Sequence, residues 1–184
     1  SLINTKPPCK LLEIGCGAGN FLYRANQSGY DVTGIDLDKK AVEHVTKRLK
    51  LKALNCSIDD LDKEIQFDII VLMGVFEHIP NPNDFLNKVK SYLKNNGELI
   101  IGVPNVQSAN KYLSSFSEHN WDMFLEPGHI YHYSKKNLNK LLKKNKFSLI
   151  KWRTATITIR GKIPFLPFRN FDLEKVIRSI SEKN

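Results

Sequence analysis

The stretch LLEIGCGAGN, residues 11–20, decides the fold. An apolar run typical of a strand meets the acid Glu13, glycines follow at every second position, and a helix can then begin at Asn20. Glycine allows a tight turn and lets a ligand touch the backbone without a Cβ in the way. A strand, a glycine turn and a helix N-terminus in this order form a nucleotide-binding loop. The stretch therefore predicts a nucleotide-binding α/β protein.

The glycine spacing distinguishes two kinds of nucleotide. A dinucleotide fingerprint has the pattern G-x-G-x-x-G, whereas here the third glycine is Gly19 and the next position holds Asn20. Asp36 ends the following apolar run, where a carboxylate can accept hydrogen bonds from both ribose hydroxyls. An acid at that place fits either ligand, so it is the spacing of the glycines that argues against a dinucleotide.

Apolar and helical segments alternate along the chain. We expect strands at 9–14, 31–35, 52–56, 67–73, 98–103 and 147–156, with helices beginning at Asn20, after Asp38, near Pro82, at 106–116 and after Ser134. The helix near Pro82 has an apolar stripe that reaches Leu93, and the helix after Ser134 has a stripe at Leu138, Leu141 and Leu142. The wholly apolar run 67–73 is typical of a strand buried on both faces of a parallel sheet. The fold class predicted is α/β, a doubly wound and mostly parallel sheet of six or seven strands with helices on both faces. A seventh strand has only residues 156–160 available to it.

Length and composition narrow the class of protein. A chain of 184 residues is long enough for one domain, which we divide into a cofactor-binding half, 1–105, and a substrate half, 106–184. The net charge is +9, but the basic residues are mostly lysines spread along the chain, which is typical of a solvated surface and makes nucleic acid an unlikely partner. The three cysteines form no C-x-x-C pair, so we expect neither structural zinc nor disulfides. No leader or membrane span is apparent, and a cytoplasmic location is expected.

Four segments resemble, in the right order, the motifs of class I S-adenosylmethionine-dependent methyltransferases: residues 13–19, 34–37, 67–71 and 93–99. Residues 75–80, VFEHIP, are similar to the ubiquinone-biosynthesis-like branch that acts on small molecules. Residues 126–134, EPGHIYHYS, resemble a proline-histidine-aromatic-serine stretch found in a subgroup of that branch. The resemblance covers roughly residues 10–105 and implies a Rossmann-like methyltransferase fold with S-adenosylmethionine as cofactor and S-adenosylhomocysteine as product.

The resemblance also implies roles for residues in the cofactor site. The glycine loop would lie against the methionine part, with Glu13 ordering the loop or binding the amino group. Asp36 would bind the ribose hydroxyls and Leu37 would pack on adenine. Positions 57 and 58 stand where the family often has an acid for the adenine amine, and Asp59 is an alternative for that contact. The cofactor-binding residues implied are Glu13, Gly15, Cys16, Gly17, Gly19, Asp36, Leu37, Ser57, Ile58, Met73 and His78. No metal ligand is expected.

The candidate catalytic residues are His129 and His132, in an aperiodic, aromatic-rich segment at 118–133. A histidine can accept a proton near neutral pH, so either one is a candidate for the base or for orienting the acceptor. The alternative is that these histidines bond to backbone and only fix the loop. We interpret Glu77 as structural, and we expect His78 to orient the next helix while touching the cofactor pocket.

The function expected is methyl transfer to a small molecule, at oxygen first, with carbon or nitrogen left open. An RNA methyltransferase is one alternative, and a non-catalytic cofactor-binding module of the same fold is another. The apolar segment 163–171 and the amphipathic helix expected from Asp172 either cover the sheet or make weak contact with a membrane surface. The oligomeric state stays open.

Overall fold

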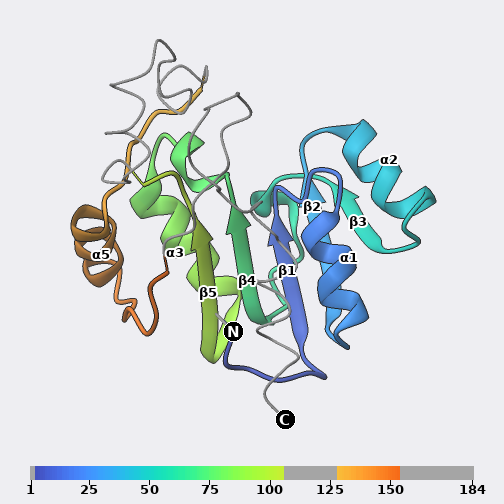
Figure 1. Cartoon of the computed structure of the whole chain (residues 1–184), viewed down its shortest axis with the longest axis horizontal. Coiled ribbons are helices and arrows are strands. Elements are labelled where there is room, and N and C mark those ends of the chain that lie inside the picture. The colour runs from blue at the N-terminus through green and yellow to red at the C-terminus, as the bar shows by residue number, and fades with distance from the viewer. Residues whose placement is uncertain (1–2, 106–127, 154–184) are drawn as a thin grey trace, which may run out of the picture.

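The computed structural model describes residues 3–105 and 128–153 of the chain, in which strands and helices alternate (Figure 1). The strands are β1 (Lys10–Ile14), β2 (Asp31–Asp36), β3 (Lys52–Asn55), β4 (Phe67–Met73) and β5 (Leu93–Gly102). The helices are α1 (Asn20–Gln27), α2 (Lys39–Lys47), α3 (Pro82–Tyr92) and α5 (Lys135–Lys144). Two one-turn helices lie at Ile58–Asp60 and Phe76–His78.

The five strands form one parallel sheet in the order β3-β2-β1-β4-β5. The chain moves outward from β1 to β3, then returns to place β4 on the other side of β1 (Figure 1). The strand order therefore reverses between β1 and β4, and open α/β sheets bind ligands beyond the carboxyl ends of the strands at such a switch point. The predicted doubly wound parallel sheet is confirmed.

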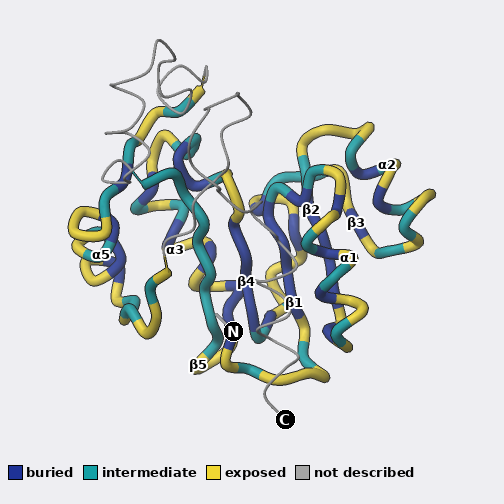
Figure 2. Tube along the Cα trace, in the orientation of Figure 1, coloured by how far each residue is buried: buried dark blue, intermediate teal, exposed yellow. Residues whose placement is uncertain are grey.

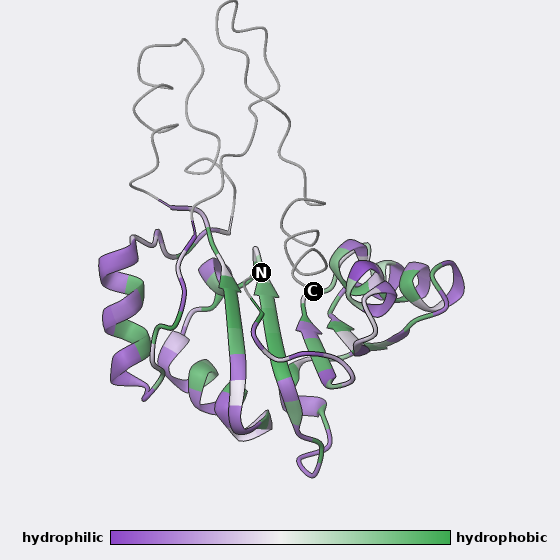
Figure 3. Ribbon diagram, turned by 60° about the horizontal axis from the view of Figure 1, so that its bottom comes forward, coloured by the Kyte–Doolittle hydropathy of each residue, from purple (hydrophilic) through white to green (hydrophobic). Residues whose placement is uncertain are grey.

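Both faces of the sheet are buried, because alternate side chains of β1 and β4 belong to different cores. Leu11 and Val71 pack with residues of α1 and α2, whereas Leu12 and Leu72 pack on the other face with residues of α3. Figure 2 shows β1 and β4 buried along most of their length, and Figure 3 shows the central strand β4 as largely hydrophobic. A strand that is covered on both faces needs a continuous apolar run, which is why the pattern at 67–73 predicted β4 correctly.

Helix α5 extends the core beside α3. Ser134 begins it with a capping box, in which its side chain accepts from the Asn137 backbone and the Asn137 side chain accepts from the Ser134 backbone. Leu138 and Leu142 are buried in a third cluster with Phe76. The lysines of α5 are exposed, and Figure 3 shows most of this helix as hydrophilic. The predicted cap and buried stripe are confirmed.

The boundary between α3 and β5 differs from the prediction. We expected the apolar stripe of the helix to reach Leu93 and the strand to begin at residue 98, but α3 ends at Tyr92 and β5 begins at Leu93. Leu93 pairs with Phe67 in β4, and the regular register resumes only at Glu98. Two tertiary contacts hold the start of β5 against β4: Leu93 is buried in the core, and Lys94 Nζ lies 2.9 Å from Asp68 Oδ1.

The sixth strand, expected at 147–156, is not formed over the described residues 147–153, and 154–156 lie outside the described ranges. The helix expected at 106–116, the candidate seventh strand at 156–160 and the C-terminal segment 163–184 also lie outside them. Within the described residues the sheet therefore has five strands rather than six or seven.

Gly34, in the middle of β2, provides a test of the packing between the sheet and the glycine loop. A Cβ at this position would lie 2.8 Å from Cys16 Sγ and 3.1 Å from Leu22 Cδ2. We expect Gly34→Ala to lower the free energy of unfolding by about 1–3 kcal/mol through overpacking, measured by urea denaturation. Adding Cys16→Ala should recover part of the loss, because it removes the sulfur. An unchanged unfolding free energy in Gly34→Ala would show that β2 and Cys16 are not closely packed.

Candidate cofactor and acceptor site

The glycine loop, residues 15–19, leaves β1 at the switch point and turns onto β2. Gly15, Gly17 and Gly19 have φ angles of +70°, +48° and +75°, in the left-handed region that favours glycine. The N–H groups of Gly15 and Cys16 both donate to the Ile35 carbonyl, at 2.8 and 3.1 Å. The loop is thereby fixed against the carboxyl end of the neighbouring strand.

The three glycines differ in what surrounds them. A Cβ on Gly15 would lie 2.4 Å from Val75 Cγ2, and one on Gly19 would lie 2.7 Å from Val45 Cγ2. A Cβ on Gly17 would meet nothing within 4 Å. Gly15 and Gly19 are therefore required by the packing of the protein itself, whereas Gly17 leaves an open surface through which a ligand can approach the backbone.

Asp36, at the end of β2, connects two loops of the site. Its carboxylate accepts hydrogen bonds from the N–H groups of Gly17 and Asp38, each at 2.8 Å. The side chain of Asn55 in β3 donates to the Asp36 and Leu37 carbonyls at 3.0 and 2.9 Å. We did not predict this contribution of Asn55 from the sequence. A carboxylate oxygen has further lone pairs, so these bonds are compatible with the ribose role predicted for Asp36.

Glu13, in β1 directly below the glycine loop, is a buried acid with 3% of its surface exposed. The pKa of Glu13 is raised to about 8, chiefly by burial. A hydrogen bond from the Leu22 backbone lowers the pKa, and the nearby charge of Asp36 raises it. Its Oε2 atom has no hydrogen-bond partner among the described residues. A buried carboxylate oxygen without a donor is costly, and a cationic ligand group beside the loop would satisfy it.

Two other predicted cofactor residues present exposed apolar side chains at the same edge of the sheet. Leu37, after β2, is 78% exposed, and Met73, at the end of β4, is 42% exposed. Gly102 in β5 makes room for Met73, since a Cβ there would lie 2.7 Å from the Met73 sulfur. Exposed side chains of this kind suit the packing surfaces that the resemblance implies for adenine and for the region near the sulfonium.

The remaining predicted cofactor residues have partners within the protein. The Cys16 side chain is buried against Gly34, and burial raises its pKa to about 12. Ser57 begins the Ile58–Asp60 turn and its hydroxyl donates to Asp60 at 2.7 Å. Ile58 is buried in the core. Contacts of Cys16 and Ile58 with a cofactor would therefore use backbone, and the adenine role of positions 57 and 58 stays a prediction.

The loop 128–133 is attached to the segment that follows β4. His78 Nδ1 lies 2.8 Å from the Gly128 carbonyl, and because a carbonyl only accepts, this nitrogen carries the proton. The N–H groups of Ile130 and Tyr131 both donate to the Glu77 carbonyl, at 2.9 and 3.1 Å. The structure therefore brings the histidine-rich loop to the carboxyl end of β4, beside the switch point.

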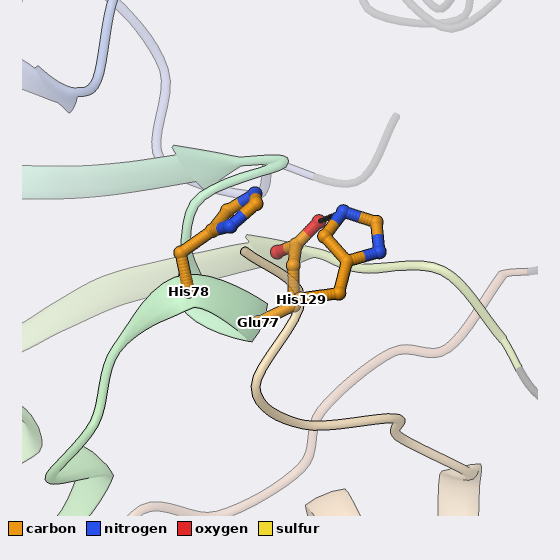
Figure 4. Close-up of side chains that lie close together, drawn as sticks. All are labelled: Glu77, His78 and His129. Carbon is orange, nitrogen blue, oxygen red and sulfur yellow. Dashed lines mark ion pairs between the residues drawn. The ribbon is translucent and has the colours of Figure 1, made fainter. Parts of the chain in front are cut away.

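His129 is enclosed by this arrangement (Figure 4). Its Nε2 lies 3.9 Å from Glu77 Oε1, and the two side chains are 7% and 2% exposed. The centre of its ring lies 4.7 Å from that of His78 and 6.3 Å from that of His132. The two candidate catalytic histidines thus lie close together, and Glu77 is more central than the structural role we assigned it. In the sequence, the one feature that could have indicated a role for Glu77 is its position between the apolar pair Val75-Phe76 and His78.

Glu77, His78 and His129 offer ligand-type atoms within 4.8 Å of one another, the one such group of three found in the described residues. Carboxylate and imidazole atoms are of the kind that divalent transition metals bind. One imidazole nitrogen of His78 is already bonded to the Gly128 carbonyl. The sequence-based expectation that no metal ligand is present stays a prediction.

These features fit a nucleoside that carries a cationic amino-acid chain. Gly17 leaves the loop open, Glu13 holds an unpartnered acceptor beside it, and Asp36 ends β2 where ribose is expected. Together with the strand order, they define the class I S-adenosylmethionine-dependent methyltransferase fold. The profile of the methyltransferase domain family matches residues 2–151, and the chain belongs to this family.

Known proteins similar to this chain support that assignment. A ubiquinone biosynthesis O-methyltransferase from Pelagibacter ubique is 32% identical over 156 residues, which are 73% of this chain and 62% of the relative. The chain thus spans about three fifths of the relative's length. A methyltransferase structure from Archaeoglobus fulgidus matches with a TM-score of 0.69 at 20% identity, covering 96% of this chain and 78% of that one. The plantazolicin methyltransferase BpumL, solved with a desmethyl analogue and S-adenosylhomocysteine, matches with a TM-score of 0.60 at 26% identity, over 76% and 55% of the two chains. Among the described residues, none of the helices has the length and apolar character to cross a bilayer.

The raised pKa of Glu13 predicts how stability depends on pH. Its pKa is about 8 in the folded chain, against 4.5 ordinarily. The stability it contributes is fully present below pH 4.5 and is lost as the pH rises towards about 8, because in this range the unfolded chain ionises the acid while the folded chain holds it neutral. Glu13→Gln should remove this loss, so the variant should gain on the order of a few kcal/mol relative to the parent between about pH 5.5 and about pH 8.5. Urea denaturation of the parent and the variant at both pH values measures this stability difference. A difference that does not change with pH would contradict the prediction.

Proposed function

We propose that this chain binds S-adenosylmethionine at the carboxyl ends of β1, β2 and β4 and transfers its methyl group to an oxygen atom of a small molecule. The observation that carries the proposal is the open backbone at Gly17 beside the buried and partly unpartnered carboxylate of Glu13. Asp36 holds the ribose hydroxyls, and the exposed side chains of Leu37 and Met73 contact the adenine and the region near the sulfur. His78 borders the pocket through its ring.

The chemistry required of the protein is modest. The bound cofactor supplies a methyl group on a cationic sulfur, which keeps the C–S bonding pair when the acceptor oxygen bonds the methyl carbon. The protein aligns the two reactants, and alignment alone is worth on the order of 7–11 kcal/mol. The acceptor hydroxyl must also lose its proton. His129 or His132 takes it, since an imidazole is a suitable base near neutral pH.

The proposed acceptor is a small hydroxyl compound with an apolar or aromatic body. The relatives' name, ubiquinone biosynthesis O-methyltransferase, supports oxygen as the methylated atom. Ile130 and Tyr131, on the loop attached to Glu77, are 50% and 38% exposed, and such side chains favour an apolar partner. No observation on the described residues favours RNA as the acceptor or a module without turnover.

We also propose a cytoplasmic location. The three cysteines, Cys9, Cys16 and Cys56, are all free thiols, and thiols stay reduced in the cytosol. The segment from residue 163 that suggested weak membrane contact lies outside the described residues.

Calorimetry with S-adenosylmethionine and S-adenosylhomocysteine tests the proposal first, and transfer of a labelled methyl group to catechol and caffeic acid tests the acceptor class. We expect both nucleosides to bind and at least one phenol to be methylated at oxygen. If neither nucleoside binds, both the proposed cofactor and the proposed enzymatic activity are refuted. Binding with no transfer to any phenol would favour the non-catalytic module, and RNA affinity with a steep salt dependence would favour the RNA enzyme.

Asp36→Ala should weaken cofactor binding by about 1–3 kcal/mol, because a charged hydrogen-bond acceptor is lost and the bond to the Gly17 N–H is lost with it. Asp31→Ala is the matched control, since Asp31 is an exposed acid at the opposite end of the same strand. Calorimetry on both variants checks the expectation. An unchanged dissociation constant in Asp36→Ala would show that the ribose lies elsewhere.

His129→Ala and His132→Ala, made singly, identify the base. Loss of the base should lower kcat about a hundredfold or more, and cofactor binding should stay within about twofold because neither histidine is assigned to the nucleoside. We expect His129→Ala to have the larger effect, because His129 is the one paired with Glu77. Steady-state kinetics with a methylated phenol measures both. Full turnover in both variants would mean that neither imidazole accepts the proton.

A further inference from the structure

We infer that Glu77 is a positioning residue for His129: its buried carboxylate orients the imidazole and holds a proton on Nε2, so that Nδ1 receives the proton of the acceptor hydroxyl. The inference rests on the proposed function, because it assigns a task within the same reaction. It changes our initial interpretation of Glu77 as structural.

The distance and burial of the two side chains support a direct interaction. Glu77 Oε1 and His129 Nε2 are 3.9 Å apart, with exposed fractions of 2% and 7%. Charges that are shielded from water are screened much less than surface charges. The separation is longer than a hydrogen bond, and catalytic pairs in ligand-free structures are often long and shorten when the reactants bind. A cation that forms on His129 would therefore be stabilised by the carboxylate.

The orientation of the ring determines which nitrogen can act as the base. Figure 4 shows Nε2 of His129 directed at Glu77, with the second ring nitrogen on the far side of the ring. An ionised carboxylate only accepts hydrogen bonds, so it favours the tautomer with the proton on Nε2. In that tautomer the lone pair is on Nδ1. The acceptor's proton would move to Nδ1 while its oxygen forms the bond to the methyl carbon.

The main chain of Glu77 fixes the geometry of this pair. Its carbonyl accepts from the N–H groups of Ile130 and Tyr131, the two residues that follow His129. On the other side of the histidine, the Gly128 carbonyl is bonded to the His78 ring. The backbone on both sides of His129 is thus attached to the one-turn helix that carries Glu77, so the ring and the carboxylate keep their separation before any acceptor binds.

The hydrogen bonding of Glu77 argues against a purely structural role for its side chain. Within the described residues, Oε2 is buried and has no hydrogen-bond partner, and burying an unsatisfied acceptor destabilises a fold. The contacts that attach the loop use the carbonyl of Glu77 and not the carboxylate. Among the described residues, the other titratable rings near His129 are His78 and His132, and Glu77 is the acid paired with this ring.

The test compares Glu77→Gln, which keeps the size and one acceptor but removes the charge, with Glu77→Met, which removes both. We expect kcat for a phenolic acceptor to fall at least about tenfold in Glu77→Gln and further in Glu77→Met. The acceptor KM and the cofactor dissociation constant should stay within about twofold. Glu98→Gln is the matched control, because Glu98 pairs with Ile69 near the start of β4 and its side chain binds Asn4 and Thr5, and it should retain full turnover.

A second measurement needs no substrate. Nitrogen NMR of the His129 imidazole in the ligand-free protein should show the Nε2-protonated tautomer in the parent, and a mixture of tautomers in Glu77→Met. If Glu77→Met has lost stability, the comparison of Glu77→Gln with the parent still tests the pairing. His129→Gln, which lacks the imidazole, serves to assign the His129 signal.

Unchanged kcat in both Glu77 variants, or a His129 tautomer that does not depend on Glu77, would overturn the inference while leaving the proposed function intact. Loss of parent turnover in a chelator, restored by a divalent cation, would also overturn it, because Glu77 would then act through the metal. Absence of cofactor binding in the parent would instead refute the proposed function, and the NMR result would still report on the pairing of Glu77 with His129.

Discussion

Two backbone N–H groups share one carboxylate at the end of β2, and the cofactor half of the site depends on that arrangement. Asp36 accepts from Gly17 and from Asp38 at 2.8 Å, so the loop after β1 and the loop after β2 cannot move independently. Asn55 adds β3 through the carbonyls of Asp36 and Leu37. The carboxyl ends of three adjacent strands are thus joined by polar contacts, and the loop above them needs no side chain at Gly17.

The other half of the site is organised by a carbonyl. The turn after β4 holds the loop 128–133 through the backbone of Glu77 and the ring of His78. The loop after β1 is therefore fixed by a carboxylate that binds backbone, whereas the loop 128–133 is fixed by the carbonyl of Glu77, whose carboxylate takes no part in these bonds. The two halves meet at the carboxyl ends of the adjacent strands β1 and β4, where the strand order reverses.

The parts of the fold that depend on local patterns were predictable. The buried run at β4, the cap of α2 by Asp38 and the cap of α5 by Ser134 all follow from residues close in the sequence. The start of β5 was not predictable, because it depends on the burial of Leu93 and on the pair between Lys94 and Asp68, contacts that only the folded sheet provides.

The candidate site divides in the same way. The glycine loop and Asp36 have a local signature, and the structure joins them through the hydrogen bond from the Gly17 N–H to Asp36. The proximity of Glu77 and His129 could not be deduced, because these residues are far apart in the sequence and the contact between their segments is made by main-chain atoms. A hydrogen bond between main-chain atoms does not depend on side-chain identity, so no sequence pattern predicts it.

That main-chain attachment has a consequence for how the protein can change over evolutionary time. The N–H groups of Ile130 and Tyr131 hold the loop whatever their side chains are, while those side chains are exposed at its surface. Substitutions there can alter the shape and polarity presented to an acceptor without detaching the loop that carries His129. If His129 is the base, as proposed, selectivity and catalysis would be encoded by different atoms of adjacent residues, and a new acceptor could be adopted while the base keeps its place.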